Sequence, residues 1–263
     1  MRKNVIALIT CFFIGFFVVF TVYNSINKIT NPMKSFSKHS ISKALKEEMI
    51  KKNIWSNQCP VAIERLNLLY ISYIDFDGKE NHDGELVVHD VVADHVLEIF
   101  KILYESKFPI ASIRLINEFD GNDEKSMENN NSSAFNCRKT LNNKLSIHAY
   151  GLAIDINPQQ NPFLSTHYEM GKLNIPTFPP QGMEYINRQN IRNGMVESVL
   201  SEESKETVVD IFTKYGFTVW GGRWDDPIDW HHFQVTQKQA EIISELSYDE
   251  GKKFFNQISK FLE

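Results

Sequence analysis

The sequence predicts an α+β fold, a single domain with a small, mostly antiparallel sheet flanked by helices, preceded by an N-terminal membrane anchor. Segments with strand-like and helix-like apolar spacing follow one another without the strict alternation that is typical of parallel α/β sheets. The 263 residues are 42% hydrophobic and 23% charged, a globular composition that excludes a disordered or fibrous chain. The net charge of −5 argues against nucleic acid as a partner, because phosphate binding normally comes with a basic surplus.

Residues 1–30 have the features of a membrane segment. Arg2 and Lys3 precede an uncharged run whose apolar part extends from Val5 to Val22. That run is close to the lower limit for crossing a bilayer, is long for a secretory signal peptide, and is not followed by an A-x-A cleavage site. We therefore expect a signal-anchor, with a cleaved signal peptide as the alternative. Since the basic end of such a segment stays in the cytoplasm, we expect the rest of the chain outside it.

The elements after this segment can be placed from composition and spacing. Residues 31–54 are polar and Lys-rich and are interpreted as a tether with a short helix near residues 42–52, so that the globular domain spans residues 55–263. Short runs rich in Ile, Val, Phe or Tyr predict strands at residues 69–76, 113–119, 153–157, 217–220 and 232–235. Helical spacing predicts helices at residues 89–104 and 207–215, and the capping box Thr236-x-x-Gln239 predicts the start of a C-terminal helix. Residues 123–133, DEKSMENNNSS, are expected to form a surface loop.

The first concentration of chemically useful residues is the stretch LSIHAYGLAIDINP at residues 145–158. His148 and Asp155 are an odd number of residues apart, so on one straight strand they would face opposite ways, but a tight turn at Gly151 would let both point to one place. An imidazole nitrogen and a carboxylate oxygen are both normal zinc ligands. A carboxylate inside an apolar strand is also costly unless it is paired or holds a metal. The alternative is a buried Asp155 that caps a turn, with His148 as its partner.

The second concentration is WGGRWDDPIDWHHFQV at residues 220–235. The Gly pair at residues 221–222 allows the backbone to come close to another group. A His just before the apolar strand would supply a third ligand, and either His231 or His232 could do so. Asp229, a few residues earlier, could hold an attacking water. The alternative is a polar loop with stacked aromatic rings.

Together these residues suit a catalytic zinc site, which needs three protein ligands and an open fourth position. Such a metal lowers the pKa of a bound water to ~7 and polarises the bond to be cut. A carboxylate near the water can act as general base and then return the proton to the leaving amine. A cationic group opposite would stabilise the oxyanion, and Arg138, upstream of His148, is the candidate.

The two motifs resemble those of a known family. S-x-H-x-x-G-x-A-x-D is present at residues 146–155, and D-x-x-H at residues 229–232. This pattern resembles the M15 zinc peptidases, which include VanY-type D-alanyl-D-alanine carboxypeptidases and L-alanyl-D-glutamate endopeptidases. Residues 131–138 and the WGG at residues 220–222 are similar to the carboxypeptidase-like branch. The resemblance extends over roughly residues 55–235.

The resemblance also implies roles for individual residues. The zinc ligands would be His148, Asp155 and His232. Asp229 would be the general base, Arg138 would bind substrate and the oxyanion, and Ser146 would lie near the substrate. His231 falls at a position that the family fills variably. Gln234 is a departure, because these proteins often have Glu there; it has no catalytic role in this mechanism.

The resemblance and the anchor together indicate a zinc-dependent peptidase of the cell envelope, inner-membrane-anchored or secreted, with its catalytic domain outside the cytoplasm. The expected substrate is the peptidoglycan stem peptide, cut at D-alanyl-D-alanine, with the L-alanyl-D-glutamate bond as the alternative. The expected cofactor is Zn²⁺, no nucleic acid is bound, the membrane is contacted through the N-terminal segment, and the chain is a monomer. Other interpretations are a non-catalytic wall-binding module, a zinc amidase of small amides, and a metal-free interaction protein.

The remaining candidates have weaker signals. Five histidines outside the motifs are expected at the surface or in packing: His39, His82, His89, His95 and His167. Asp120 and Asp123 are expected to be solvated rather than at the edge of a cleft. Trp224 and Trp230 could line a substrate groove or simply cover the metal loop, and Trp230 is expected to contact the substrate. An oxidising compartment favours a disulfide between Cys59 and Cys137, with two buried thiols as the alternative.

Overall fold

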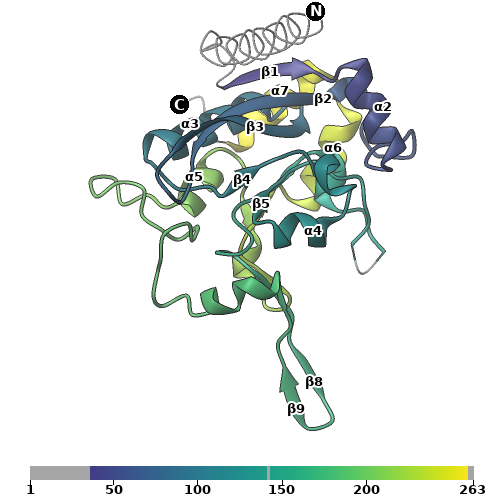
Figure 1. Cartoon of the computed structure of the whole chain (residues 1–263). Coiled ribbons are helices and arrows are strands. Elements are labelled where there is room, and N and C mark those ends of the chain that lie inside the picture. The colour runs from purple at the N-terminus through teal and green to yellow at the C-terminus, as the bar shows by residue number, and fades with distance from the viewer. Residues whose placement is uncertain (1–35, 141–142, 260–263) are drawn as a thin grey trace, which may run out of the picture. The chain divides into compact units, whose positions relative to one another are not determined.

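A three-stranded antiparallel sheet in the order β1-β2-β3 forms one layer of the fold (Figure 1). The computed structural model describes residues 36–140 and 143–259. The strands are β1 (Ser37–Ser40), β2 (Leu66–Ile74) and β3 (Glu80–His89). The helix α3 (Ala93–Glu105) contacts β2 and buries its apolar face, as its helical spacing predicted. Strand β3 was not predicted, because its first half, ENHDG, has no apolar side chain and is mostly exposed.

The prediction of a tether at residues 31–54 was wrong from Phe36 onward, where the compact unit begins. Strand β1 pairs with β2, and the predicted short helix is α2 (Lys43–Lys51), which packs Met49 into the core. This segment has few apolar residues among many lysines, so its composition does not indicate that it packs on the core. The predicted anchor at residues 1–30 lies outside the described residues. No helix within residues 36–140 and 143–259 is long and apolar enough to cross a bilayer.

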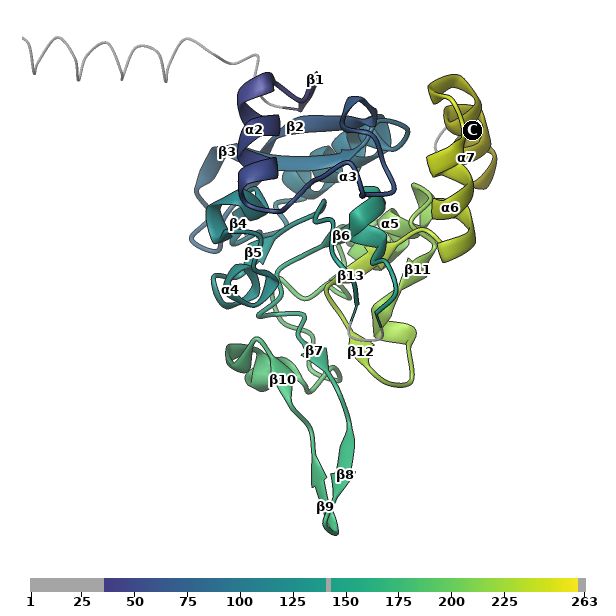
Figure 2. The ribbon, with the colours of Figure 1, turned by 90° about the vertical axis from the view of Figure 1, so that its right-hand side faces the viewer.

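The rest of the fold is built from smaller sheets. One has the order β11-β13-β6 and another the order β10-β7-β12, and all their pairings are antiparallel. Figure 2 shows the first of these between the β1-β2-β3 sheet and the second. Their bounds are β6 (Ala153–Asp155), β7 (Phe163–Leu164), β10 (Thr177–Phe178), β11 (Val219–Trp220), β12 (Ile228–Asp229) and β13 (His232–Gln234). The α+β class with small antiparallel sheets is therefore confirmed, although the single sheet is in fact several.

Two further strand pairs complete the sheets. The short strands β4 (Ser112–Ile113) and β5 (Asn131–Ser132) are parallel. The hairpin of β8 (His167–Glu169) and β9 (Lys172–Asn174) extends away from the other labelled elements in both views (Figures 1 and 2).

The described part of the chain after residue 207 contains three α-helices: α5 (Val208–Lys214), α6 (Gln237–Glu245) and α7 (Tyr248–Ile258). The predicted capping box of Thr236 and Gln239 is present at the start of α6. The predicted helix at residues 207–215 is α5, and its Phe212 ring stacks on Phe233 with centroids 4.1 Å apart. Since Phe233 follows His232 directly on β13, this stacking anchors a strand of the candidate site in the core.

Two predictions between residues 113 and 133 were wrong. The strand expected at residues 113–119 ends after β4, and the chain then forms a 3₁₀ turn at Ile116–Phe119. The loop expected at residues 123–133 contains the helix α4 (Asp123–Glu128), whose N-cap Asn122 accepts a hydrogen bond from the Lys125 amide at 2.9 Å. Both elements are too short for apolar periodicity to be read from the sequence.

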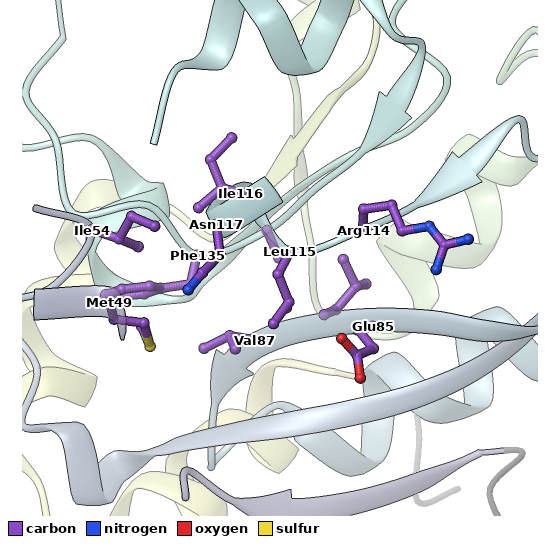
Figure 3. Close-up of a pocket in the computed structure, with 11 residues that line it drawn as sticks. Met49, Ile54, Glu85, Val87, Arg114, Leu115, Ile116, Asn117 and Phe135 are labelled. Atoms are coloured by element: carbon purple, nitrogen blue, oxygen red, sulfur yellow. The ribbon is translucent and has the colours of Figure 1, made fainter. Parts of the chain in front are cut away.

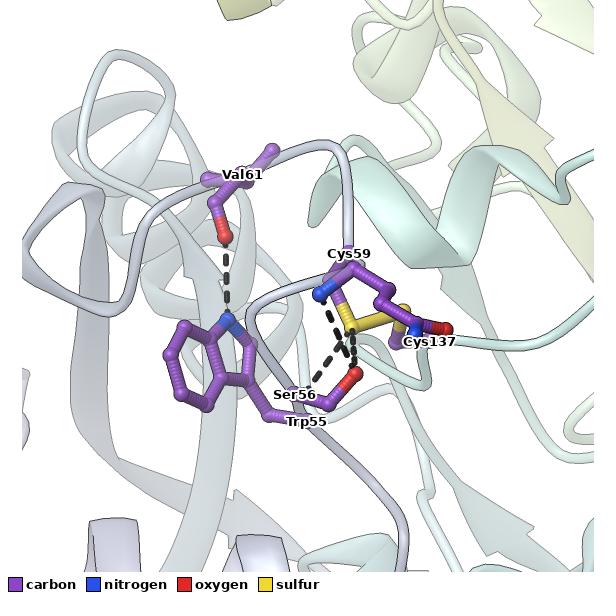
Figure 4. The surroundings of a disulfide bond; sticks show 6 residues. Trp55, Ser56, Cys59, Val61 and Cys137 are labelled. Atoms are coloured by element: carbon purple, nitrogen blue, oxygen red, sulfur yellow. Dashed lines mark hydrogen bonds between the residues drawn. A yellow bond between two sulfur atoms is a disulfide. The ribbon is translucent and has the colours of Figure 1, made fainter.

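The predicted disulfide between Cys59 and Cys137 is present, with the two Cα atoms 6.0 Å apart (Figure 4). The Cys137 amide also donates to the Ile54 carbonyl at 3.1 Å. The bridge therefore links the segment after α2 to the segment that carries Arg138.

A cavity of about 10 Å³ lies between α2, β3 and the chain after β4 (Figure 3). Its lining is mostly apolar and includes Met49, Ile54, Val87 and Phe135. This volume is at the lower limit for holding one water molecule, so the cavity is too small to bind a substrate.

His89, at the end of β3, is expected to make stability depend on pH. Burial lowers its pKa below the usual value, and the contact with Asp90 only partly opposes this. As pH falls below about 6.5, the unfolded chain therefore binds the proton first, and stability falls by up to about 1.4 kcal/mol per pH unit until the folded pKa is reached. Urea unfolding of the full chain at pH 7.5, 6.5 and 5.5 should show a smaller loss for His89→Gln than for the wild type. Equal losses would contradict this assignment.

Candidate metal centre

The motif at residues 146–155 folds as a capped turn followed by a strand. Ser146 begins a 3₁₀ helix (Ile147–Tyr150) by accepting a hydrogen bond from the His148 amide at 3.3 Å. Gly151 ends it with a φ of 67°, and an added Cβ would lie 2.6 Å from the His89 nitrogen, so glycine is required here. The chain then enters β6, which ends at Asp155. The turn predicted at Gly151 is present; the substrate contact predicted for Ser146 stays a prediction, and its hydroxyl is used as the cap.

His148, Asp155 and His232 lie together, as the sequence predicted. His148 Nε2 is 3.1 Å from Asp155 Oδ2 and 3.2 Å from His232 Nδ1, and His232 Nδ1 is 2.9 Å from Asp155 Oδ1. Asp155 and His232 are directly opposite each other in the pairing of β6 with β13. All three are buried, with 3%, 8% and 6% exposed. Zinc bonds of about 2.0–2.1 Å in a tetrahedron place neighbouring ligand atoms about 3.3 Å apart, so the three spacings fit one zinc ion.

Hydrogen bonds behind the two imidazole rings support the same interpretation. His148 Nδ1 donates to the Ala134 carbonyl at 2.5 Å, and His232 Nε2 donates to Gln234 Oε1 at 2.7 Å. In neutral rings the inward nitrogens then carry lone pairs, and these face each other and the Asp155 carboxylate. That arrangement is repulsive unless a cation lies between them, so the donor set fits a metal ion.

The ionisable side chains of the site shift one another's pKa values. Burial alone would raise the pKa of Asp155, but positive charge on His148 and His231 holds it well below its usual range. Burial likewise lowers the pKa of His232, and the hydrogen bond and charge of Asp155 outweigh this and raise it. A carboxylate that stays ionised while buried beside two imidazoles is a ready cation ligand.

The partly buried Asp229 and the buried His231 form a second pair beside the three ligands. His231 Nε2 is 3.0 Å from Asp229 Oδ1, and His231 Nδ1 donates to the Asn161 carbonyl at 2.8 Å. Burial lowers the pKa of His231, but the charges of Asp229 and Asp155 outweigh this and raise it to about 9. Of the two histidines left open by the sequence, His232 therefore joins the ligand group and His231 contacts Asp229 instead.

The close backbone approach predicted for the Gly pair is found at Gly221. An added Cβ there would lie 2.5 Å from the Asp229 carbonyl oxygen. The 3₁₀ turn at Gly221–Arg223 therefore packs directly on the strand that carries Asp229.

Arg138 lies on a segment that runs beside the metal motif. Its carbonyl accepts from the Ser146 amide at 3.1 Å, and its side chain forms an ion pair with Asp123. Asp123 also accepts a hydrogen bond from the Asn136 amide group at 2.8 Å. The prediction that Asp123 is simply solvated was therefore wrong, whereas the side chain of Asp120 is mostly exposed and forms an ion pair with Lys52. The oxyanion role of Arg138 stays a prediction.

The tryptophans divide between packing and exposure. Trp230 is 8% exposed. The Arg188 guanidinium stacks on the Trp230 ring at 4.7 Å, and the Trp230 carbonyl accepts a hydrogen bond from Trp220 Nε1. This burial favours the alternative in which Trp230 covers the metal loop, over the predicted substrate contact. Trp224 is partly exposed, and its ring centroid is 5.5 Å from that of His232. Trp224 is therefore the better candidate for a substrate-lining ring.

Sequence reasoning missed the groups that hold the ligands and the base in place. Gln234 could have been found, because it is two residues after His232 on one strand and so shares its face. The carbonyls of Ala134 and Asn161 carry no signal in the sequence. The histidines outside the motifs behave as predicted: His89 and His95 are buried in packing, and His39, His82 and His167 are exposed.

A comparison with known protein families gives a match over the site. A model of an M15 peptidase family, described as D-alanyl-D-alanine carboxypeptidase, matches residues 140–235. That range contains the three candidate ligands and Asp229. No curated protein and no solved structure matches the chain. Residues 140–235 of the chain are therefore similar to the M15 family of peptidases.

Proposed function

We propose that the chain is a zinc-dependent D-alanyl-D-alanine carboxypeptidase that acts on peptidoglycan stem peptides. The observation that carries the proposal is the buried group of His148, Asp155 and His232, with ligand atoms within 4.8 Å of one another. The description of the matching family supports the same activity. A non-catalytic binding module would not need the Asp229 carboxylate next to this group.

The chain's own residues supply most of the chemistry. His148, Asp155 and His232 would hold zinc, which when bound activates water and polarises the scissile carbonyl. Asp229 would take the proton of the attacking water and pass it to the leaving amine. Arg138 would bind either the oxyanion or the terminal carboxylate of the substrate, because a guanidinium can pair with both.

The cellular setting forms part of the proposal. The apolar run at residues 5–22 supports an inner-membrane-anchored or secreted protein with its site outside the cytoplasm, where peptidoglycan lies. The disulfide between Cys59 and Cys137 supports an oxidising compartment. We propose that the chain acts there as a monomer.

Digestion of purified muropeptides by the full chain tests the proposal. A pentapeptide stem should lose the mass of one Ala, and a chelator should abolish this until zinc is added back. The exposed substitution Asp249→Asn on α7 is a matched control that should leave the reaction unchanged. Release of a peptide that begins at D-Glu would instead indicate an L-alanyl-D-glutamate endopeptidase. Absence of any cleavage by zinc-loaded protein would contradict a wall peptidase.

A further inference from the structure

We infer that His231 is a positioning residue that fixes the carboxylate of Asp229, and that the peptide carbonyl of Asn161 fixes His231 in turn. The inference rests on the proposed function for one point, the role of Asp229 as general base. His231 is not a fixed position of the D-x-x-H motif and is not one of the three candidate ligands.

The contacts of His231 lock its ring at both nitrogens. Nε2 lies 3.0 Å from Asp229 Oδ1, and Nδ1 donates to the Asn161 carbonyl at 2.8 Å. The whole residue is 4% exposed, and the His231 carbonyl accepts from the Ile156 amide at 3.0 Å. The ring therefore has one orientation, in which a nitrogen faces the carboxylate.

The carbonyl behind the ring is itself held rigidly. The Asn161 side chain donates to the carbonyls of Ile156, Asn157 and Gly194 at 3.0, 3.2 and 3.0 Å. Its Oδ1 accepts from the Val196 amide at 2.9 Å. Asn161 is fully buried, so both hydrogen-bonding ends of its side chain are occupied by the surrounding chain.

An ion pair extends this support. Arg188 Nη2 donates to Asn161 Oδ1 at 2.9 Å, and Arg188 Nε donates to Glu197 Oε1 at 2.9 Å. The same guanidinium stacks on Trp230, the residue between Asp229 and His231. The loop that carries the base is thus held through the ring of His231 and through the ring of Trp230.

Asp229 needs such support because little else fixes its side chain. It ends the two-residue strand β12, and its buried Oδ1 has no hydrogen-bond partner among the described residues, only the ion pair with His231. The carboxylate must still hold a water in the geometry of attack, and a misplacement of about 1 Å can cost about 100-fold in rate. The alternative role, His231 as a metal ligand, disagrees with the contact that its Nε2 makes.

Two matched substitutions test the contacts of the two His231 ring nitrogens one at a time. Gln places an amide nitrogen near the position of Nε2 and keeps the contact to Asp229, whereas Asn reaches only the position of Nδ1 and keeps the bond to Asn161. We expect His231→Asn to lower kcat on a stem pentapeptide by about 10- to 100-fold with little change in KM. His231→Gln should stay within about threefold of the wild type, and both variants should keep their zinc.

A structural measurement keeps the test independent of the substrate. Crystal structures of the zinc-loaded full chain should show the Asp229 carboxylate in one position in the wild type and His231→Gln, and displaced in His231→Asn. An unmoved carboxylate with full kcat in His231→Asn would overturn the inference, and so would an equal loss of activity in both variants. Loss of zinc from both variants would make His231 a ligand. If the wild type cleaves no stem peptide, that result counts against the proposed function alone. The positions of the Asp229 carboxylate in the three crystal structures would still decide the role of His231.

Discussion

Replacing Asp229 by Ala is expected to lower kcat for stem-peptide hydrolysis by about 10²- to 10⁴-fold, the usual contribution of a general base. The three candidate ligands do not include Asp229, so the variant should keep its zinc. Steady-state kinetics and elemental analysis of the same protein sample check both parts of this prediction.

The matched variant for this experiment is Asp229→Glu, which keeps the charge but lengthens the side chain by one methylene. Gly221 packs against the Asp229 backbone and Cβ, so the loop has little room to adjust. Asp229→Glu should therefore be impaired, but less than Asp229→Ala. Full activity of Asp229→Ala would remove Asp229 from the mechanism, and loss of its zinc would make Asp229 part of the metal site.

Replacing both Cys59 and Cys137 by Ser is expected to lower the free energy of unfolding by about 4 kcal/mol. The bridge spans a sequence separation of 78 residues, and a cross-link over a long loop removes much of the entropy of the unfolded chain. The same segment carries Ala134, whose carbonyl holds His148, so zinc affinity should also fall.

Urea unfolding with and without reductant measures this effect. Reductant should destabilise the wild type to the level of the double variant and leave the double variant unchanged. A double variant as stable as the oxidised wild type would show that the bridge contributes nothing to stability.

The candidate ligands could be predicted because their chemistry is local in sequence and their geometry follows from simple pairing. His148 and Asp155 flank a glycine turn, and the antiparallel pairing of β6 with β13 places His232 opposite Asp155. Strand formation by apolar runs and a left-handed Gly151 are both visible in the sequence.

The parts that could not be predicted depend on contacts between distant segments. Nothing in the sequence at residues 36–54 shows that β1 adds to β2, because its exposed side chains are polar. The choice between His231 and His232 is decided by which ring faces Asp155 across the sheet and which meets the Asn161 carbonyl. Every residue has a backbone carbonyl, so the residue type does not show which carbonyl accepts the hydrogen bond of His231.

The zinc content of the purified full chain is the most direct test of the central claim, that His148, Asp155 and His232 form the metal centre. After dialysis against buffered zinc, elemental analysis should give one zinc per chain for the wild type, Asp229→Ala and His231→Gln. It should give none for His148→Ala, Asp155→Ala and His232→Ala, with the folded state of each checked by circular dichroism. A folded His148→Ala that keeps one zinc, or a wild type that binds none, would contradict the account.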